Sequence, residues 1–426
     1  MPTMNQMNWL VAYPEILLLV AACVVALVDL NVTDPRRNVT FWLTQLSLAA
    51  VAFMHGLALQ TGLGTDGAAA SVYGMQGMVV SDPMGHMLAM CAALAMMLTM
   101  AYARPYIGDR ELLKGEFFTL SMFVLLGISV MISATNFLVI YVGLELMSLS
   151  LYALVALRRD HAVATEAAMK YFVLGALASG FLLYGMSMLY GATRSLDLSE
   201  VFEAIHTGQI NATVLTFGVV FIVAGLGFKL GVVPFHMWVP DVYQGAPTAV
   251  TLLIAGAPKL AAFAIAIRLL VEGLSGLAHD WQQMLIVMSV LSMTIGNLAA
   301  IAQSNLKRML AFSAIAQLGF MLLGLTPTVI DANTESAANG YSSAMFYVVT
   351  YVLTTLGTFG LIMYLSRSGF ESDEISDLAG LSQAAVMSDK LRNRLKLLGI
   401  EQSWKPGDNP VVFWDIYGQN GHPLRT

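Results

Sequence analysis

The sequence predicts an all-α protein, a polytopic bundle of about eleven transmembrane helices. Of its 426 residues, 57% are hydrophobic and only 11% are charged, whereas an ordinary soluble domain carries about 25% charged residues. The mean hydropathy is +0.71. Apolar runs recur from residue 10 to residue 366, each near the roughly 20 residues that cross a hydrocarbon core as a helix. Continuous runs of this kind do not favour a β-barrel, whose strands alternate in polarity.

Hydropathy and helix-breaking residues place these spans in order along the chain. The first run contains Glu15 and lacks both a basic leader and a clear small-residue cleavage site, so we expect a retained span and not a signal peptide. The expected spans are 10–30, 40–60, 82–103, 117–132, 135–157, 168–190, 213–233, 248–272, 282–302, 309–326 and 342–366.

The basic residues of the links lie almost entirely in alternate links. One set of links holds Arg36, Arg37, Arg104, Arg110, Lys114, Arg158, Arg159, Lys307, Arg308 and Arg367. The other set holds only Arg194. Because cytoplasmic links carry the excess of Lys and Arg, this pattern predicts an amino terminus outside the membrane and a cytoplasmic carboxyl-terminal tail.

The sequence offers no binding site for a redox cofactor. Both cysteines, Cys23 and Cys91, fall inside apolar runs, which argues against a thiolate metal cluster and against a disulfide framework. No phosphate loop, dinucleotide-binding fingerprint or metal-spaced histidine cluster appears. The net charge of −6 is spread over short links without a basic face, so nucleic acid is not an expected partner. Any redox centre therefore belongs to a partner.

One helix is expected to be broken inside the membrane. The segment Gly227–Asp241 contains Lys229, His236, two glycines and two prolines. A proline removes a hydrogen bond and clashes with the preceding turn, so the helix should break before Pro234. Broken helices are typical of ion-handling transporters, in which freed carbonyls meet the transported species. The alternative is that the prolines simply end the span and open a cytoplasmic turn.

Five ionisable residues are candidates for proton transfer at bilayer depth: Glu145, Lys170, Lys229, His236 and Lys259. A buried ammonium costs about 2.5 to 3.5 kcal/mol on insertion scales, so repeated burial indicates that the protein handles charge there. A lysine in apolar surroundings, close to a carboxylate, can shed and regain a proton.

Each candidate also has a purely structural interpretation. Lys170 lies close to the cytoplasmic end of its span and could extend to the headgroups. Glu145 and Lys229 could form a static salt bridge between two spans. His236 could be a polar residue satisfied at a helix end. Lys259, near the middle of its span, is the hardest to explain in structural terms alone.

Three strings resemble a known family. They are residues 143–154 (GLELMSLSLYAL), 227–248 (GFKLGVVPFHMWVPDVYQGAPT) and 302–313 (AQSNLKRMLAFS). They are similar to subunit N of bacterial NADH-quinone oxidoreductase, respiratory complex I, and the likeness extends from about residue 9 to about residue 383. The middle string is highly specific to the antiporter-like subunits of that complex.

The resemblance implies a proton-moving subunit of the membrane arm, with other membrane-arm subunits and the lipid bilayer as partners. NADH, FMN, iron–sulfur clusters and quinone would reside in partner subunits, and this chain would bind no cofactor. By motif, Glu145 matches the glutamate of the fifth span, Lys229 the broken-helix lysine and Lys259 the central lysine of the eighth span. Lys170 and His236 match residues that link them. The implied location is the bacterial inner membrane.

The resemblance also implies a domain organisation. Residues 1–112 would form three N-terminal helices, 113–275 the first antiporter-like repeat, and 276–383 part of a second, inverted repeat. The family has about fourteen spans, so about three spans and an exit lysine are missing. Residues 384–426, which hold six of the 21 Lys and Arg residues, depart from the family. A frame disruption and a native cytoplasmic extension both explain this tail.

Two other functions compete with the complex I reading. The chain could belong to a stand-alone multisubunit cation/proton antiporter, because such proteins share the broken-helix lysines by ancestry. It could also be a structural membrane scaffold, with its lysines in static ion pairs.

Overall fold

The predicted bundle of about eleven transmembrane helices is confirmed. The computed structural model describes residues 8–61, 71–207, 211–326, 335–366 and 370–378. Within these residues, 11 helical stretches are long and apolar enough to cross a membrane. Each coincides with an expected span, and the largest difference is at the ninth, which begins at Ser275 and not at 282. The tail from 379 to 426 lies outside the described residues.

Residues 1–371 form one compact unit, and the chain from Ser372 onward forms a second. Of the second unit, the described residues contain one short helix, η5 (Ile375–Leu378). The first part of the larger unit consists of η1 (Trp9–Ala12), α1 (Tyr13–Asp29), α2 (Asn38–Thr61), the antiparallel strands β1 (Val72–Gly74) and β2 (Val79–Ser81) joined by η2 (Met75–Gly77), and α3 (Pro83–Gly108).

The remaining elements of the larger unit are long helices and several shorter helical pieces. They are α4 (Gly115–Ser133), α5 (Phe137–Val155), α6 (Ala162–Thr193), α7 (Leu198–Thr207), α8 (Ala212–Leu230), α9 (Trp238–Gly245), α10 (Thr248–Ala255), α11 (Pro258–Ala266), the π-helix η3 (Ile267–Gly273), η4 (Ser275–Leu277), α12 (Ala278–Ile301), α13 (Leu306–Leu323) and α14 (Glu335–Leu365).

Asparagine and aspartate side chains set the starts of several spans. Asp82 Oδ1 accepts a hydrogen bond from the Gly85 backbone N–H at 2.7 Å and caps α3. Asn136 caps α5 and Asn305 caps α13 in the same way. Short polar side chains satisfy the free N–H groups of a first turn, which explains why the long helices begin at these residues.

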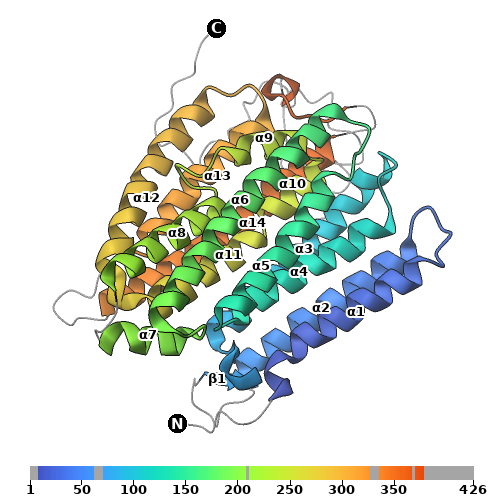
Figure 1. Cartoon of the computed structure of the whole chain (residues 1–426). Helices are drawn as coiled ribbons and strands as arrows, with labels where there is room; N and C mark the ends of the chain where they lie inside the picture. The colour runs from blue at the N-terminus through green and yellow to red at the C-terminus, as the bar shows by residue number, and fades with distance from the viewer. Residues whose placement is uncertain (1–7, 62–70, 208–210, 327–334, 367–369, 379–426) are drawn as a thin grey trace. The chain divides into compact units, whose positions relative to one another are not determined.

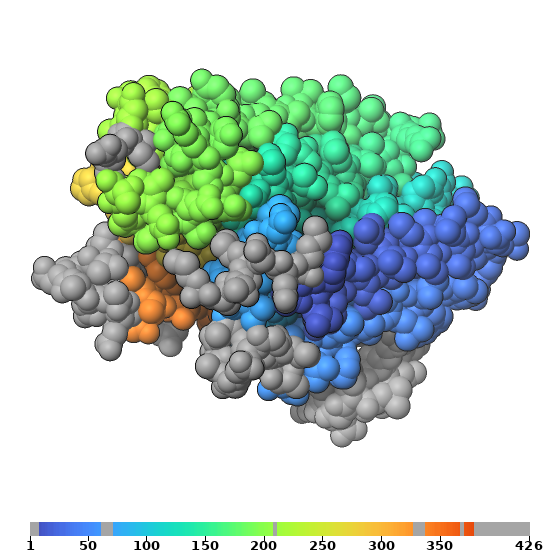
Figure 2. Space-filling view, turned by 60° about the horizontal axis from the view of Figure 1, so that its bottom comes forward, coloured from blue at the N-terminus to red at the C-terminus, as the bar shows by residue number. Residues whose placement is uncertain are grey.

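The larger unit has two ends, seen at the top and bottom of Figure 1. We call them the α9 end, which also carries the link between α5 and α6, and the β1 end, which also carries α7. In Figure 2, α1 and α2 (blue) lie at one edge of the visible face, and α6 (green) lies at another. In Figure 1, the first two helices lie on the other side of the bundle from α8, the helix that carries Lys229.

Glycine permits the close contact between α6 and α8. A Cβ atom on Gly185 would lie 2.8 Å from the Gly218 carbonyl oxygen and 2.9 Å from the Ile222 backbone nitrogen. Small residues let membrane helices approach to backbone contact. This contact packs α8 closely against α6.

The expected end of the helix before Pro234 is confirmed. Helix α8 ends at Leu230, and Gly231 follows in the left-handed conformation with φ of 82°. Its N–H bonds to the Gly227 and Phe228 carbonyls, a common way for glycine to close a helix. The chain then turns through residues 231–237 before α9 begins at Trp238. A second break, at Gly256 between α10 and α11, was not anticipated from the sequence.

Candidate functional site

Lys229 lies in the last turn of α8 and reaches across to two neighbouring helices. Its ammonium donates to Ser148 Oγ on α5 at 2.9 Å and to Ser179 Oγ on α6 at 3.4 Å. Both serines are buried. Hydroxyl acceptors of this kind compensate part of the free energy lost when an ammonium leaves water.

Lys259 is almost completely buried, with 2% of its surface exposed. Its Nζ donates to the backbone carbonyls of Lys229, at 3.1 Å, and Leu230, at 3.0 Å. Carbonyls in the last turn of a helix have no partner within the helix, and they carry the negative end of its dipole. The break after Leu230 thus supplies the acceptors that hold this cation.

Gly231 is needed for this arrangement. A Cβ atom there would lie 2.7 Å from Val239 Cγ2, and Lys259 Nζ is 3.9 Å from the same point. A positive φ and so little space favour glycine over every other residue.

Trp238, the first residue of α9, forms a wall of the same site. The Lys259 ammonium lies 5.3 Å from its ring centroid, within the range of a cation–π contact. Its indole N–H donates to the Phe228 carbonyl at 3.0 Å, and its ring stacks on Tyr171. A cavity of about 20 Å³ is lined by Lys229, Lys259 and Trp238 among others. A single water needs at least about 10 to 15 Å³.

Glu145 lies on α5, three residues before Ser148. Its Oε1 is buried without a hydrogen-bond partner. Among the described residues, no ion pair within 4 Å joins Glu145 to Lys229, so the two do not form a direct salt bridge in this structure. Ser148 is the group on α5 that Lys229 contacts.

Lys170 belongs to a separate cluster at the α9 end. It pairs with Glu166 and with Asp241, each at 2.8 Å. Asp241 also binds Arg308 of α13 at 2.8 Å, and Arg308 in turn bonds to Gln244. Burial alone would raise the pKa of Asp241, but the hydrogen bonds and charges of Lys170 and Arg308 outweigh it and hold this pKa below its ordinary value. These side chains are between 32% and 65% exposed, so they form a wetted ionic network.

His236 lies in the turn between α8 and α9. Its Nδ1 is buried and has no hydrogen-bond partner. Burial lowers the pKa of His236, and a backbone hydrogen bond at Pro234 opposes this effect only in part. The ring is therefore mainly neutral at pH 7, with one nitrogen able to accept a proton.

The structure brings together three of the five candidates and separates the other two. Lys229 and Lys259 share one cavity, and Glu145 lies one turn of α5 from the serine that binds Lys229. Lys170 lies in the ionic network, and His236 in the turn. Neither serine was expected in the site, and Ser148 was interpreted from the sequence as a packing residue. Their spacing from Glu145 and from Lys170 is visible in the sequence, but serine is common in membrane helices as a packing residue.

The described residues contain no group of three or more His, Cys, Asp or Glu that could hold a metal ion. Cys23 and Cys91 are free thiols.

Comparison with known proteins identifies the family. The family model described as NADH:quinone oxidoreductase/Mrp antiporter, TM, matches residues 134–388. Subunit N of NADH-quinone oxidoreductase from Polaromonas naphthalenivorans (strain CJ2) is 62% identical over 387 residues, which are 90% of this chain and 75% of that protein. The chain belongs to the subunit N family of NADH-quinone oxidoreductase. The subunit N of Herminiimonas arsenicoxydans is 60% identical, over 89% of this chain and 76% of its own.

Solved structures agree with this assignment. Respiratory complex I from Thermus thermophilus with bound aureothin contains a chain that is 31% identical, with a TM-score of 0.70, over 87% of this chain and 74% of its own. The Mrp complex from Dietzia sp. shares the fold at a TM-score of 0.71 but is 19% identical over 83% of this chain and 65% of its own. The antiporter alternative is therefore the less supported one. The chain is an antiporter-like membrane subunit of a proton-translocating NADH:quinone oxidoreductase.

A second family model, described as Helicase HerA-like C-terminal, matches residues 363–426. The tail is therefore similar to a different family from the rest of the chain. Neither the frame disruption nor the cytoplasmic extension considered from the sequence anticipated this similarity.

Proposed function

We propose that this chain moves protons along a line of buried side chains that runs from Glu145 through Lys229 to Lys259. The observation that carries the proposal is the junction of the two lysines. Lys259 Nζ binds the backbone of Lys229 itself, and both side chains line a cavity with room for one water. Proton transfer requires donor and acceptor within hydrogen-bond reach, directly or through one water.

In this scheme Glu145 acts on Lys229 through the field of its carboxylate. Lys229 contacts α5 at Ser148, three residues after Glu145, and no direct ion pair holds the lysine permanently charged. Coulomb interactions across a weakly polarisable interior remain strong at distances beyond a hydrogen bond. Protonation of Glu145 would therefore change how strongly Lys229 holds its proton.

Lys170 and His236 would link this line to water at the α9 end. His236 offers a free buried nitrogen beside the break, and the ionic network around Lys170 and Asp241 is solvent-exposed. Following the distribution of basic links, we propose that the α9 end faces the cytoplasm and that the amino terminus lies outside the inner membrane.

The same proposal assigns the wider organisation. Residues 1–112, 113–275 and 276–383 would be the N-terminal helices, the first repeat and a partial second repeat, followed by the tail 384–426. NADH, FMN, iron–sulfur clusters and quinone would be bound by partner subunits, since the redox reaction needs them and the lysine site offers only amines, hydroxyls and carbonyls.

The scaffold alternative predicts static ion pairs for the lysines. Lys170 does sit in such pairs. Among the described residues, Lys229 and Lys259 bind hydroxyls and carbonyls and form no ion pair within 4 Å. Hydrogen bonds to neutral acceptors leave a lysine free to exchange its proton, so the geometry favours proton transfer at these two positions.

The test is Glu145→Gln in the assembled complex, with proton uptake measured per NADH oxidised. We expect fewer protons per NADH with assembly intact. Glu116→Gln is the matched control, because Glu116 is an exposed carboxylate in the first turn of α4. Equal proton yields in both variants would contradict the proposal.

A further inference from the structure

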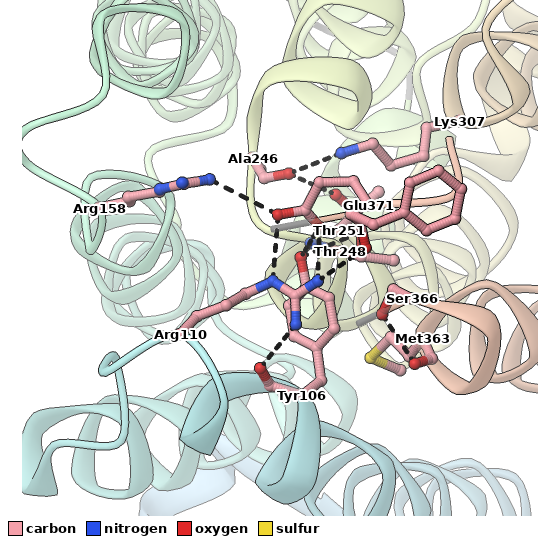
Figure 3. Close-up of polar contacts among 11 residues, drawn as sticks. Tyr106, Arg110, Arg158, Ala246, Thr248, Thr251, Lys307, Met363, Ser366 and Glu371 are labelled. Carbon is pink, nitrogen blue, oxygen red and sulfur yellow. Dashed lines mark hydrogen bonds and ion pairs between the residues drawn. The ribbon is translucent and has the colours of Figure 1, made fainter. Parts of the chain in front are cut away.

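A second group of charged residues lies at the α9 end, around Glu371 (Figure 3). Arg110, just after α3, donates to Glu371 through Nε at 3.0 Å and through Nη2 at 3.1 Å. This is the two-pronged geometry that guanidinium and carboxylate groups favour. Arg158 approaches the same carboxylate at 3.6 Å. The Arg110 side chain is 7% exposed and that of Glu371 is 31% exposed.

The same carboxylate accepts a third hydrogen bond, from Tyr106 on α3. Tyr106 Oη donates to Glu371 Oε2 at 2.7 Å and accepts from the Thr248 backbone N–H at 3.2 Å. Thr248 is the first residue of α10, so its N–H has no partner within the helix. A tyrosine oxygen that gives its proton to a carboxylate becomes a stronger acceptor, because hydrogen bonds in a chain polarise one another.

The carboxylate is held in its charged form. Burial by itself would raise the pKa of Glu371, but the hydrogen bonds from Arg110 and Tyr106 and the positive charges nearby lower it below the ordinary value. The chain of contacts from Arg110 to Thr248 is therefore complete at neutral pH.

These hydrogen bonds end at Thr248, in the junction between α9 and α10. On its other side, Lys307 of α13 donates to the Ala246 carbonyl at 3.2 Å, as Figure 3 also shows. Side chains from two helices thus fix Ala246 and Thr248. These residues lead into α10 and, past the break at Gly256, into α11 with Lys259. Lys259 follows Thr248 by eleven positions along the chain.

We infer that Glu371 is a positioning residue for the broken helix α10–α11, acting through Tyr106 on the first N–H of α10. It holds the helix at the height where Lys259 Nζ meets the carbonyls of Lys229 and Leu230. The inference rests on the proposed function of Lys259, and it assigns no direct contact between Glu371 and the transferred proton.

The experiment compares Glu371→Gln, Glu371→Asp and Tyr106→Phe in the assembled complex. A glutamine side chain has one acceptor oxygen and an NH₂ group that faces the donors of Arg110 and Tyr106, so the fork cannot form. Aspartate keeps the charge. Two quantities are measured: hydrogen exchange of backbone amides in residues 246–252, and protons taken up per NADH oxidised.

Arg158→Gln is the matched control, because Arg158 contacts Glu371 only at 3.6 Å, with a side chain that is 42% exposed, and does not touch Tyr106. We expect Glu371→Gln and Tyr106→Phe to speed amide exchange at Thr248 about tenfold and to lower the proton yield, while NADH oxidation persists. Glu371→Asp should restore most of both quantities, and Arg158→Gln should change neither.

Unchanged exchange at Thr248 in Glu371→Gln, or faster exchange with a normal proton yield, would overturn the inference. Failure of the proposed function is recognised separately, by a normal proton yield when Lys259 itself is replaced. A uniform loss of assembly in all three variants would also count against a positioning role, because Glu371→Asp retains the charge that the role requires.

Discussion

The replacement Lys259→Met tests the lysine site most directly, because methionine has nearly the same length and no charge. In the native chain Lys259 donates two hydrogen bonds to carbonyls at 3.0 and 3.1 Å. Hydrogen bonds from a charged group contribute about 1.5 to 3 kcal/mol each, so the variant loses about 3 to 6 kcal/mol of interaction. It also escapes the desolvation penalty of the ammonium, which is several kcal/mol.

These two terms nearly cancel, so we expect the free energy of unfolding to change by no more than about 2 kcal/mol. Proton transfer should change far more, since the variant has no group at this position that can take up a proton. The prediction is that the complex assembles, oxidises NADH and translocates fewer protons per NADH. Proton uptake by proteoliposomes, measured together with NADH absorbance, gives both quantities.

Leu260→Met is the matched control. Leu260 is the next residue of α11 and is also fully buried. This swap of similar volume costs less than about 1.5 kcal/mol and leaves the lysine in place. A proton yield in Lys259→Met equal to that of Leu260→Met would refute the reasoning, whatever the stability of either variant.

Three further predictions follow from the same contacts. Ser148→Ala removes the shorter hydrogen bond of Lys229, worth up to about 3 kcal/mol, so the pH profile of proton translocation should shift; Ser179→Ala, at 3.4 Å, should shift it less. Gly231→Ala places a side chain at φ of 82° and 2.7 Å from Val239, so thermal unfolding should show a loss of about 1 to 3 kcal/mol. Asp241→Asn should lower the melting temperature slightly and equally at pH 7.5 and pH 5.0. The contribution of Asp241 to stability is fully present above its ordinary pKa of 3.8, and it is lost only as the pH falls through the still lower pKa of the folded state. If the difference in melting temperature between Asp241→Asn and the native chain disappeared at pH 5.0, the assignment would be contradicted.

The number and the order of the spans could be predicted because the bilayer fixes the length of every helix. An apolar run ended by Arg36 and Arg37, or by Arg158 and Arg159, leaves little choice about where a helix stops. The break before Pro234 was predictable for a local reason, since proline and Gly231 both oppose a continuing helix. The break at Gly256 was missed, although Pro258 follows two residues later and opposes a continuing helix in the same way.

The charged residues of the site could be predicted from the sequence, whereas the serines that accept hydrogen bonds from them could not. A lysine among apolar residues is conspicuous, so Lys229 and Lys259 could be found from the sequence. Their partners are two serines and two backbone carbonyls. The carbonyls lie at the expected end of α8, but nothing in the sequence distinguishes Ser148 and Ser179 from other serines. The contact between Glu371 and Tyr106 joins residues 265 positions apart, which no local pattern can reveal.

The acceptors of Lys259 explain why this site suits proton transfer better than a salt bridge would. A neutral lysine has two N–H donors and one lone pair, and an ammonium has three donors. Two carbonyls lie within hydrogen-bond distance, so a neutral lysine can satisfy both and keep its lone pair for an incoming proton. On protonation the third donor becomes available to the cavity that Lys229 also lines. Neither state requires the carbonyl contacts to be broken. A carboxylate in their place would favour the charged state strongly and hold the proton, which is how Lys170 is bound by Glu166 and Asp241 at the surface.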